Sequence, residues 1–412
     1  MIPELYKYIK HEGYKLSTFQ ADCIAGITVA IVALPLSMAL AIASGASPEK
    51  GLVTAVVAGF FISFAGGTRL QIGGPTGAFI IIVFDVIAEH GYDGLLLATF
   101  MAGIILIISG YLKLGKIIEH VPHCVLTGFT TGLSIILLSS QIKDFFGLSI
   151  QQVPSHFIEK WYVYFAHFST INPFALMIGF ISLLIILFQR KYFAKLPGSL
   201  IVVIISSIMI YVFHLPVETI GSKYPNIEIG LPTPQLPEWN ISLLIQLLPS
   251  ALTIAFLAGV ESLLCAVITD RMTKYKHNSN QELVGQGIAN IASSLFGGIS
   301  ATGALARTVT NIQAGAKTPM AGIIHSLLIL SFIVLGMNLT KFIPLACLSG
   351  ILFVVAWNMS EAKNFISLFK NSKVEYSIML ITFFTTIFIG VSEAISIGLV
   401  LSLLAKRYKF SL

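Results

Sequence analysis

The sequence predicts an all-α polytopic membrane protein of about 14 transmembrane segments, and three observations support this prediction. Hydrophobic residues make up 56% of the 412 residues and charged residues only 11%, whereas soluble domains are roughly one quarter charged. The hydrophobic residues fall in blocks of about 15 to 25, long enough to cross about 30 Å of hydrocarbon as helices. Runs this long and continuous favour helices over barrel strands, because lipid offers the backbone no hydrogen-bond partner.

The predicted segments follow one another in two halves. They are residues 19–44, 50–66, 70–90, 94–112, 121–146, 171–190 and 198–214, then 242–268, 282–297, 301–316, 319–336, 341–357, 375–391 and 393–405. We expect residues 19–214 and 242–412 to form two inverted repeats of seven segments, joined outside the membrane by the proline-rich connector 215–241. Residues 1–18 place apolar side chains on one helical face and predict a short interfacial helix on the cytoplasmic side.

Basic residues predict the orientation. The chain has 25 lysines and arginines, and nearly all of those in loops fall on the side of the N-terminus. The exceptions are Lys50, Lys143, Lys160, Lys223 and Lys341. Because cytoplasmic loops carry an excess of Lys and Arg, both termini are expected in the cytoplasm and the protein in the inner (plasma) membrane. This bias also explains the net charge of +6, and no basic stripe with interleaved aromatics indicates nucleic-acid binding.

Two segments, the third of each half, begin with glycine-rich extended stretches at residues 71–75 and 297–303. Interrupted segments at corresponding positions mark the substrate site of inverted-repeat transporters. A half-helix that starts at the midplane exposes unpaired N–H groups and the positive end of its dipole, and both favour an anion. Pro75 suits the first turn of one half-helix. The alternative is that the glycines serve only close helix packing. The expected substrate-binding residues are Gly74, Pro75, Thr76, Gly303, Ala304, Leu305, Ala306 and Arg307.

Two ionisable residues, Glu261 and Arg307, lie deep inside predicted segments. A charge at the membrane centre costs about 2.5–3.5 kcal/mol on insertion scales, so each needs a partner, a cavity or a role. Arg307 falls just inside the second half-helix, where a fixed cation would strengthen an anion site. Glu261 is expected to carry the coupling proton, and the open alternative is a buried Glu261–Arg307 pair that only pins two helices. Asp85, His325 and Glu393 are interpreted as helix-end or packing residues.

The sequence predicts neither a cofactor nor a metal site. The four cysteines are widely spaced in or beside apolar segments, and no HExxH, GxSxG or convincing Ser/His/Asp set occurs. The polar stretch 270–282 ends in Ser279 and Glu282, whose spacing predicts a capping box. We expect a transporter rather than an enzyme, and its partners are a small inorganic or carboxylate anion, a proton (with Na⁺ as the alternative) and the lipid bilayer.

Five stretches carry a family resemblance: AGITVA at 25–30, LPLSMALA at 34–41, GGPTG at 73–77, ESLL at 261–264 leading to KHNSNQELVGQG at 276–287, and ARTVTN at 306–311. As an ordered set they resemble the SulP (sulfate permease) family, the bacterial relatives of the SLC26 anion transporters. The resemblance implies a seven-plus-seven inverted-repeat fold, a core domain that moves against a gate domain, and a homodimer. Family members usually continue into a cytoplasmic STAS domain, which is absent from this chain.

Within the family, the chain resembles the bacterial C4-dicarboxylate and bicarbonate transporters. Sodium–bicarbonate members carry an Asp where Glu261 stands, with hydroxyl residues at places that correspond to Cys265 and Leu305 here. A thiol and an alkyl group offer sodium no hard oxygen ligand. Pro35-Leu36-Ser37 also departs from the Pro-Gln-Gly of many relatives, which argues against sulfate.

The expected function is therefore secondary active anion transport, as proton-coupled symport of a C4-dicarboxylate or bicarbonate by alternating access. Sodium-coupled bicarbonate or sulfate transport, and an anion channel or uniporter of the same fold, are the alternatives. A uracil- or purine-type permease can share the fold, but it would favour carboxylates or amides at the site over Arg307.

Overall fold

The computed structural model describes residues 2–118, 122–150, 153–154, 156–193, 197–227, 229–360, 362–368 and 373–409. Lys195 and Lys370, which the loop count places on the side of the N-terminus, lie outside these residues. The described chain is mostly helical, and its only sheet has two strands of two residues each.

The first half contains α1 (Glu4–His11), α2 (Leu16–Ala43), α3 (Pro48–Ala65), β1 (Gly73–Gly74), the 3-10 turn η1 (Gly77–Phe79), α4 (Ile80–Tyr111), α5 (Gly115–Ile118), α6 (His123–Ser140), α7 (Ile142–Phe146), α8 (Phe157–Ala166), η2 (Phe168–Thr170), α9 (Pro173–Tyr192) and α10 (Gly198–Phe213). The connector holds α11 (Ile220–Lys223). The second half contains α12 (Ile241–Met272), α13 (Ser279–Leu295), β2 (Thr302–Gly303), α14 (Leu305–Gln313), α15 (Met320–Leu335), η3 (Met337–Phe342), α16 (Leu345–Met359), α17 (Ala362–Leu368), α18 (Lys373–Phe388) and α19 (Val391–Lys409).

Helices occupy the positions of the predicted segments, with two differences. Seven helical stretches are long and apolar enough to cross a membrane, and α10, α15 and part of α19 are shorter apolar helices. The predicted spans 70–90 and 94–112 are two helices that meet at a kink instead of a loop, where Gly91 has φ 71° and ψ −178°. Glycine tolerates this positive φ, so the chain leaves the helical conformation at this one residue and changes direction. The amphipathic helix α8 was not predicted.

The two halves meet at equivalent positions. β1 pairs antiparallel with β2, with Gly73 opposite Gly303 and Gly74 opposite Thr302. Each strand precedes the interrupted helix of its half. An antiparallel pair formed by equivalent segments is the relation expected of two halves with opposite orientation in the membrane. The predicted fold class, an all-α membrane fold with two half-helices preceded by short strands, is confirmed, whereas the exact limits of the repeats stay a prediction.

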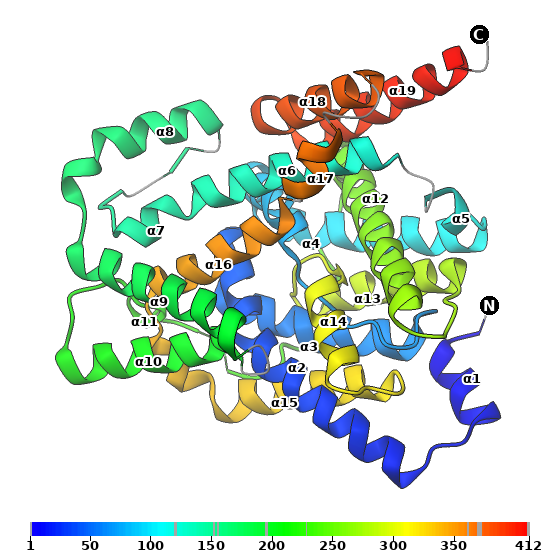
Figure 1. The fold of residues 1–412 in the computed structure, drawn as a ribbon, viewed down its shortest axis with the longest axis horizontal. Coiled ribbons are helices and arrows are strands. Elements are labelled where there is room, and N and C mark those ends of the chain that lie inside the picture. Colours follow the sequence, from blue (N-terminus) through cyan, green and yellow to red (C-terminus); the bar gives the residue numbers. More distant parts are fainter. Residues whose placement is uncertain are drawn as a thin grey trace.

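The helices pack in two groups with α2 in contact with both. The first group contains α3, α4, α12, α13, α14 and α15, and the second contains α6, α9, α10, α16, α18 and α19. Both ends of the chain lie at the right in Figure 1, whereas α7, α8 and α11 lie at the left. We call these the terminal face and the opposite face. The division into two groups agrees with the expected core and gate domains, and their relative motion stays a prediction.

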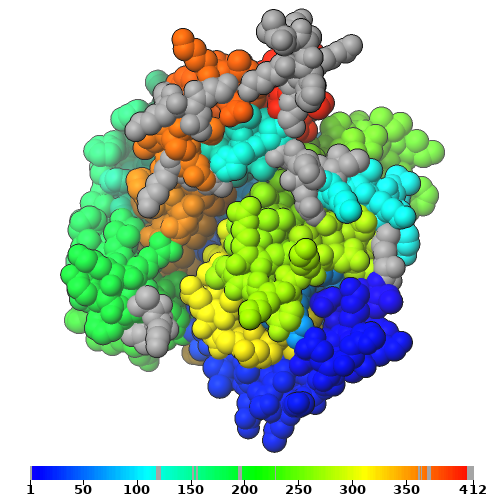
Figure 2. All heavy atoms as spheres, turned by 45° about the vertical axis from the view of Figure 1, so that its right-hand side comes forward, coloured from blue at the N-terminus to red at the C-terminus, as the bar shows by residue number. Residues whose placement is uncertain are grey.

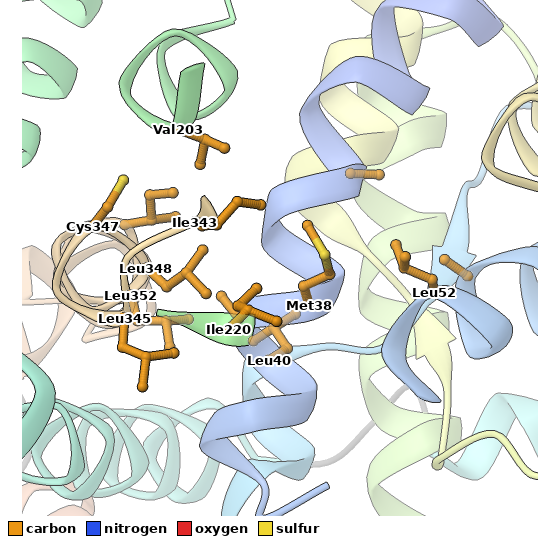
Figure 3. Packing of buried hydrophobic residues seen from close by; sticks show 14 of the residues in the cluster. Met38, Leu40, Leu52, Val203, Ile220, Ile343, Leu345, Cys347, Leu348 and Leu352 are labelled. Carbon is orange, nitrogen blue, oxygen red and sulfur yellow. The ribbon is translucent and has the colours of Figure 1, made fainter. Parts of the chain in front are cut away.

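An apolar seam joins the groups beside α2. Met38 and Leu40 of α2 lie across from Leu345 and Leu348 of α16, with Ile220 between them (Figure 3). Apolar contacts have no preferred direction, unlike hydrogen bonds. A seam of this kind is compatible with one group sliding against the other.

Candidate anion site

Both interrupted helices begin from the β1–β2 pair. The backbone N–H of Ala304 donates to the carbonyl of Ile72 at 2.8 Å, which extends the pairing to the first residue before α14. The N-cap residues are Thr76 for η1 and Ala304 for α14, and in this part of the chain neither makes a side-chain capping hydrogen bond. The first-turn N–H groups of the two helical segments are therefore not satisfied by caps. The positive ends of two helical segments therefore lie next to the same two-stranded sheet.

Arg307 connects the two half-helices. It is the third residue of α14 and only 1% exposed. Its Nη2 donates to the carbonyl of Pro75 at 3.1 Å and to the hydroxyl of Ser37 at 3.2 Å. Among the described residues, its Nε and Nη1 have no hydrogen-bond partner. A buried guanidinium with unused donors is costly unless another group satisfies them, so this place fits an anion with acceptor oxygens.

Gly74 makes room for this guanidinium. Its φ is +148°, which side-chain-bearing residues rarely adopt, and a Cβ built there would collide with Nη1 of Arg307. The glycine-rich stretch of the first half is therefore not only a helix-packing device. Gly303 differs, because a Cβ there would collide with the side chain of Gln71. At this second position the glycine makes room for a neighbouring side chain, and its role in anion binding stays a prediction.

Glu261 lies on α12 beside the same short segment. The hydroxyl of Thr76 donates to its Oε2 at 2.9 Å, and Glu261 is half-buried. No ion pair joins Glu261 to Arg307 in the part of the chain that the structure describes. Arg307 contacts Pro75 and Glu261 contacts Thr76, so the two charged side chains bind adjacent residues of one dipeptide. The direct Glu261–Arg307 pair that the sequence left open is not formed.

The other predicted site residues differ in their exposure. The prediction that Pro75 occupies a first helical turn is wrong, because the backbone stays extended through Thr76 (φ −129°, ψ 161°) and the helix begins at Gly77. Gly303 and Ala304 are buried. Leu305, at 42% exposure, and Ala306 are exposed at the start of α14. Figure 2 shows α12 and α14, in yellow-green and yellow, at the surface beside green and orange helices of the second group.

Sequence reasoning missed a buried carboxylate, Glu282. It is fully buried, and it accepts hydrogen bonds from the backbone N–H of Gly67, the hydroxyl of Ser262 and the amide of Gln286, each at 2.9 Å. Ser262 in turn accepts a hydrogen bond from Gln71 at 2.8 Å. The network ties the segment that leads into β1 to α12, directly beside Glu261. The Glu282 network therefore holds α12 and the segment before β1 in place beside the site.

The predicted capping box of Ser279 and Glu282 is wrong. Asn278 is the N-cap of α13, and its side chain accepts from the backbone N–H of Gln281 at 3.1 Å. With the helix start one residue earlier, the Glu282 carboxylate is not needed at the helix end and points inward. The spacing of acid and hydroxyl was a valid capping signal, but it did not distinguish a cap from a buried network.

Two further side chains near the site have defined surroundings. The thiol of Cys265 donates to the hydroxyl of Thr308 at 3.3 Å, and this hydroxyl also accepts from the backbone N–H of Ile72 at 3.0 Å. Cys265 thus helps to hold the start of β1 in place through Thr308. His325 on α15 is fully buried, and neither ring nitrogen has a hydrogen-bond partner among the described residues. The interpretation of His325 as a packing residue accounts for its burial but not for its unpaired nitrogens.

Comparison with known proteins agrees with this geometry. The model of the sulfate permease family matches residues 19–382. YvdB of Bacillus subtilis, whose name assigns it provisionally to sulfate transport, is 43% identical over 394 residues, which cover 95% of this chain and 74% of YvdB. The bicarbonate transporter BicA of Picosynechococcus is 31% identical over 408 residues, covering 93% of this chain and 70% of BicA.

Solved structures give the same result. The transmembrane domain of a cyanobacterial BicA matches with a TM-score of 0.82 and 32% sequence identity, covering 94% of this chain and 98% of that domain. Murine Slc26a9, described in an inward-facing state, shares the fold with a TM-score of 0.87 and 18% identity, covering 99% of this chain and 71% of that one. The relatives are named as transporters and not as enzymes. From the family match and these identities, the chain belongs to the sulfate permease family of anion transporters.

Proposed function

We propose that this protein is a secondary active transporter that moves a carboxylate-type anion, bicarbonate or a C4-dicarboxylate, together with a proton by alternating access. One observation supports this most: Arg307 is buried and has two unused donors where both half-helices begin. The carboxylate of Glu261 is held by Thr76 at the same place without being neutralised by Arg307. The site therefore offers one fixed cation and one separate proton acceptor.

The anion would be held by charge-assisted hydrogen bonds. Nε and Nη1 of Arg307 can donate to its oxygens, and the uncapped N–H groups of the two helix starts add partial positive charge. A single guanidinium balances one negative charge. This favours a singly charged oxyanion such as bicarbonate, which is also the substrate named for the BicA relatives. Bicarbonate is therefore the first substrate to test.

Electrostatic repulsion would couple the proton to the anion. A charged Glu261 beside the site repels an arriving anion, whereas a protonated Glu261 does not. Binding of the anion and of the proton should therefore favour each other, as reciprocal linkage requires. The thiol of Cys265 and the alkyl side chain of Leu305 offer no hard oxygen ligand of their own at those two places, which supports a proton rather than sodium as the coupling ion.

The remaining parts of the proposal concern assembly and orientation. We place both termini in the cytoplasm and the protein in the inner membrane, with residues 19–214 and 242–412 as the two repeats and 215–241 as an extracytoplasmic connector. The opposite face, with α7, α8 and α11, is then the outer face. A homodimer is expected from the family. The distribution of Lys and Arg supports the orientation.

Uptake into proteoliposomes tests the proposal. Labelled bicarbonate, succinate, fumarate and sulfate are each offered with an inward proton gradient, with an inward sodium gradient and with neither. Bicarbonate should accumulate above its outside concentration only with the proton gradient, and beyond the amount that protein-free liposomes take up by diffusion of CO₂. Accumulation driven by sodium alone would instead establish the sodium-coupled alternative. Downhill flux that ignores both gradients would establish a channel or uniporter.

Two variants separate the roles of the charged residues. Arg307→Ala should weaken anion binding strongly, and near-normal affinity would contradict the site. Glu261→Gln should abolish proton-driven accumulation but retain anion exchange, because the neutral amide mimics the protonated carboxyl. Glu393→Gln is the matched control, since this acid lies in the first turn of α19. Its accumulation should equal that of the unmodified protein.

A further inference from the structure

A cavity lies between the two helix groups near the opposite face. Its volume is about 160 Å³, and it is lined by the end of α2, the start of α4, and residues of α6, α7, α8 and α11. It adjoins a second cavity of about 650 Å³, with which it shares Lys143, Asp144 and Lys223. Ile80, the first residue of α4, lines the smaller cavity and follows Thr76 by about one helical turn. The cavity thus borders the helix that starts at the anion site.

Several lysines line this cavity, although few lysines and arginines are expected on this side of the membrane. Loops on the outer side are expected to be poor in Lys and Arg, and only five lysines are assigned to them. Three of these five, Lys143, Lys160 and Lys223, line the cavity. The acids that line it are Asp85 and Asp144, and Asp144 Oδ2 is 3.8 Å from Nζ of Lys223. The lining therefore carries one net positive charge.

Lys160 is the lysine of this set that is nearly buried. It lies on α8 and is 5% exposed. Its Nζ has no hydrogen-bond acceptor or ion pair among the described residues, and its described contact is the ring of Phe84 at 6.0 Å. Burial lowers the pKa of Lys160, and Asp85 opposes this with a smaller effect. An ammonium group offers three donors, and Nζ of Lys160 is not among the described buried atoms that lack a partner, so its donors are open to water or an anion in the cavity.

We propose that this cavity is a second anion site, where Lys160 and Lys143 hold a small oxyanion on its way between the outer solution and the half-helices. The volume exceeds the roughly 30 Å³ that one water occupies in the liquid, so a small oxyanion fits together with some of its hydration. One singly charged anion balances the net charge of the lining. This inference rests on the proposed transport function and orientation.

The position of the site determines what it changes kinetically. Asp85 on α4 belongs to one helix group, whereas α7 and α8 contact the other group. An anion bound between them is recruited from the outer solution before it reaches Arg307. The site should therefore set the affinity for outside anion, not the maximal rate or the coupling.

Uptake kinetics with radiolabelled bicarbonate at the outer face test this role. Lys160→Gln should raise the KM for outside bicarbonate about tenfold, the size expected for one charge-assisted hydrogen bond, with the maximal rate within about twofold. Lys160→Arg should stay near the unmodified protein. Lys341→Gln is the matched control, because this exposed outer-face lysine in η3 does not line the cavity. An unchanged KM in Lys160→Gln would overturn the proposal.

A second variant and a binding measurement cover the remaining outcomes. If Lys160→Gln does not fold, the half-exposed Lys143→Gln should still raise the KM, and no change would overturn the proposal. If the unmodified protein transports none of the anions, the transport function fails but the site can still be judged by binding. Bicarbonate should then raise the Tm of purified Arg307→Ala, and adding Lys160→Gln should remove this effect. An equal effect in both proteins, or none in either, would refute the second site.

Discussion

Gly74 offers the sharpest test of the anion site, because substitution there acts on Arg307 without altering its charge. In Gly74→Ala the new methyl group collides with Nη1 of Arg307. The backbone would also have to keep a φ of +148°, at a cost of about 1–3 kcal/mol. Displacing the guanidinium should remove at least one charge-assisted hydrogen bond to the anion, worth about 1.5–3 kcal/mol. Affinity for bicarbonate should therefore fall by about 10- to 150-fold.

Isothermal titration with bicarbonate measures this loss in proteins that also carry Lys160→Gln, which removes binding at the second cavity, and thermal unfolding measures the strain separately. Gly315→Ala is the matched control, since its φ is +93° and no atom lies within 4 Å of the added methyl group. The control should lose stability to a similar extent but keep its affinity. A folded Gly74→Ala that binds bicarbonate within about threefold of the unmodified protein would refute the placement of the anion at Arg307.

The remaining predictions concern supports of the site. Glu282→Ala leaves three buried donors without their acceptor, so it should lower the free energy of unfolding by about 3 kcal/mol. Thermal unfolding in detergent measures this loss, with the exposed Glu238→Ala as the control. Equal unfolding temperatures of the two variants would contradict the network. On the terminal face, hydrogen bonds from Arg69 at 2.8 and 2.9 Å hold the pKa of Glu12 below its usual value. The stability from this pair should be present above pH of about 4.3 and be lost as the pH falls through the lowered pKa. Glu12→Gln should accordingly speed amide exchange in α1 at neutral pH, by an amount equivalent to less than about 1 kcal/mol because Glu12 is half-exposed. The exposed Glu238→Gln, which lies outside α1, should not.

The sequence by itself determined those features that depend only on the residues within one segment. Long apolar runs indicated membrane helices, and glycine-rich starts at residues 71–75 and 297–303 indicated the two interrupted segments. Arg307 and Glu261 were identifiable because a charge inside an apolar run is costly wherever the run packs. These properties depend on the local chain and its solvent, so they are readable without knowing any neighbour.

The tertiary structure decided which groups meet. Arg307 donates to Ser37 and Pro75, which are 270 and 232 positions away in the chain, and among the described residues it forms no ion pair with Glu261. Glu282 resembled a cap until its contacts with Gly67 and Ser262 were known. Lys143, Lys160 and Lys223 line one cavity although they come from three different elements. Periodicity and hydropathy report the average surroundings of a segment, whereas hydrogen-bond partners and cavities depend on the relative placement of segments distant in sequence, which only the packed fold defines.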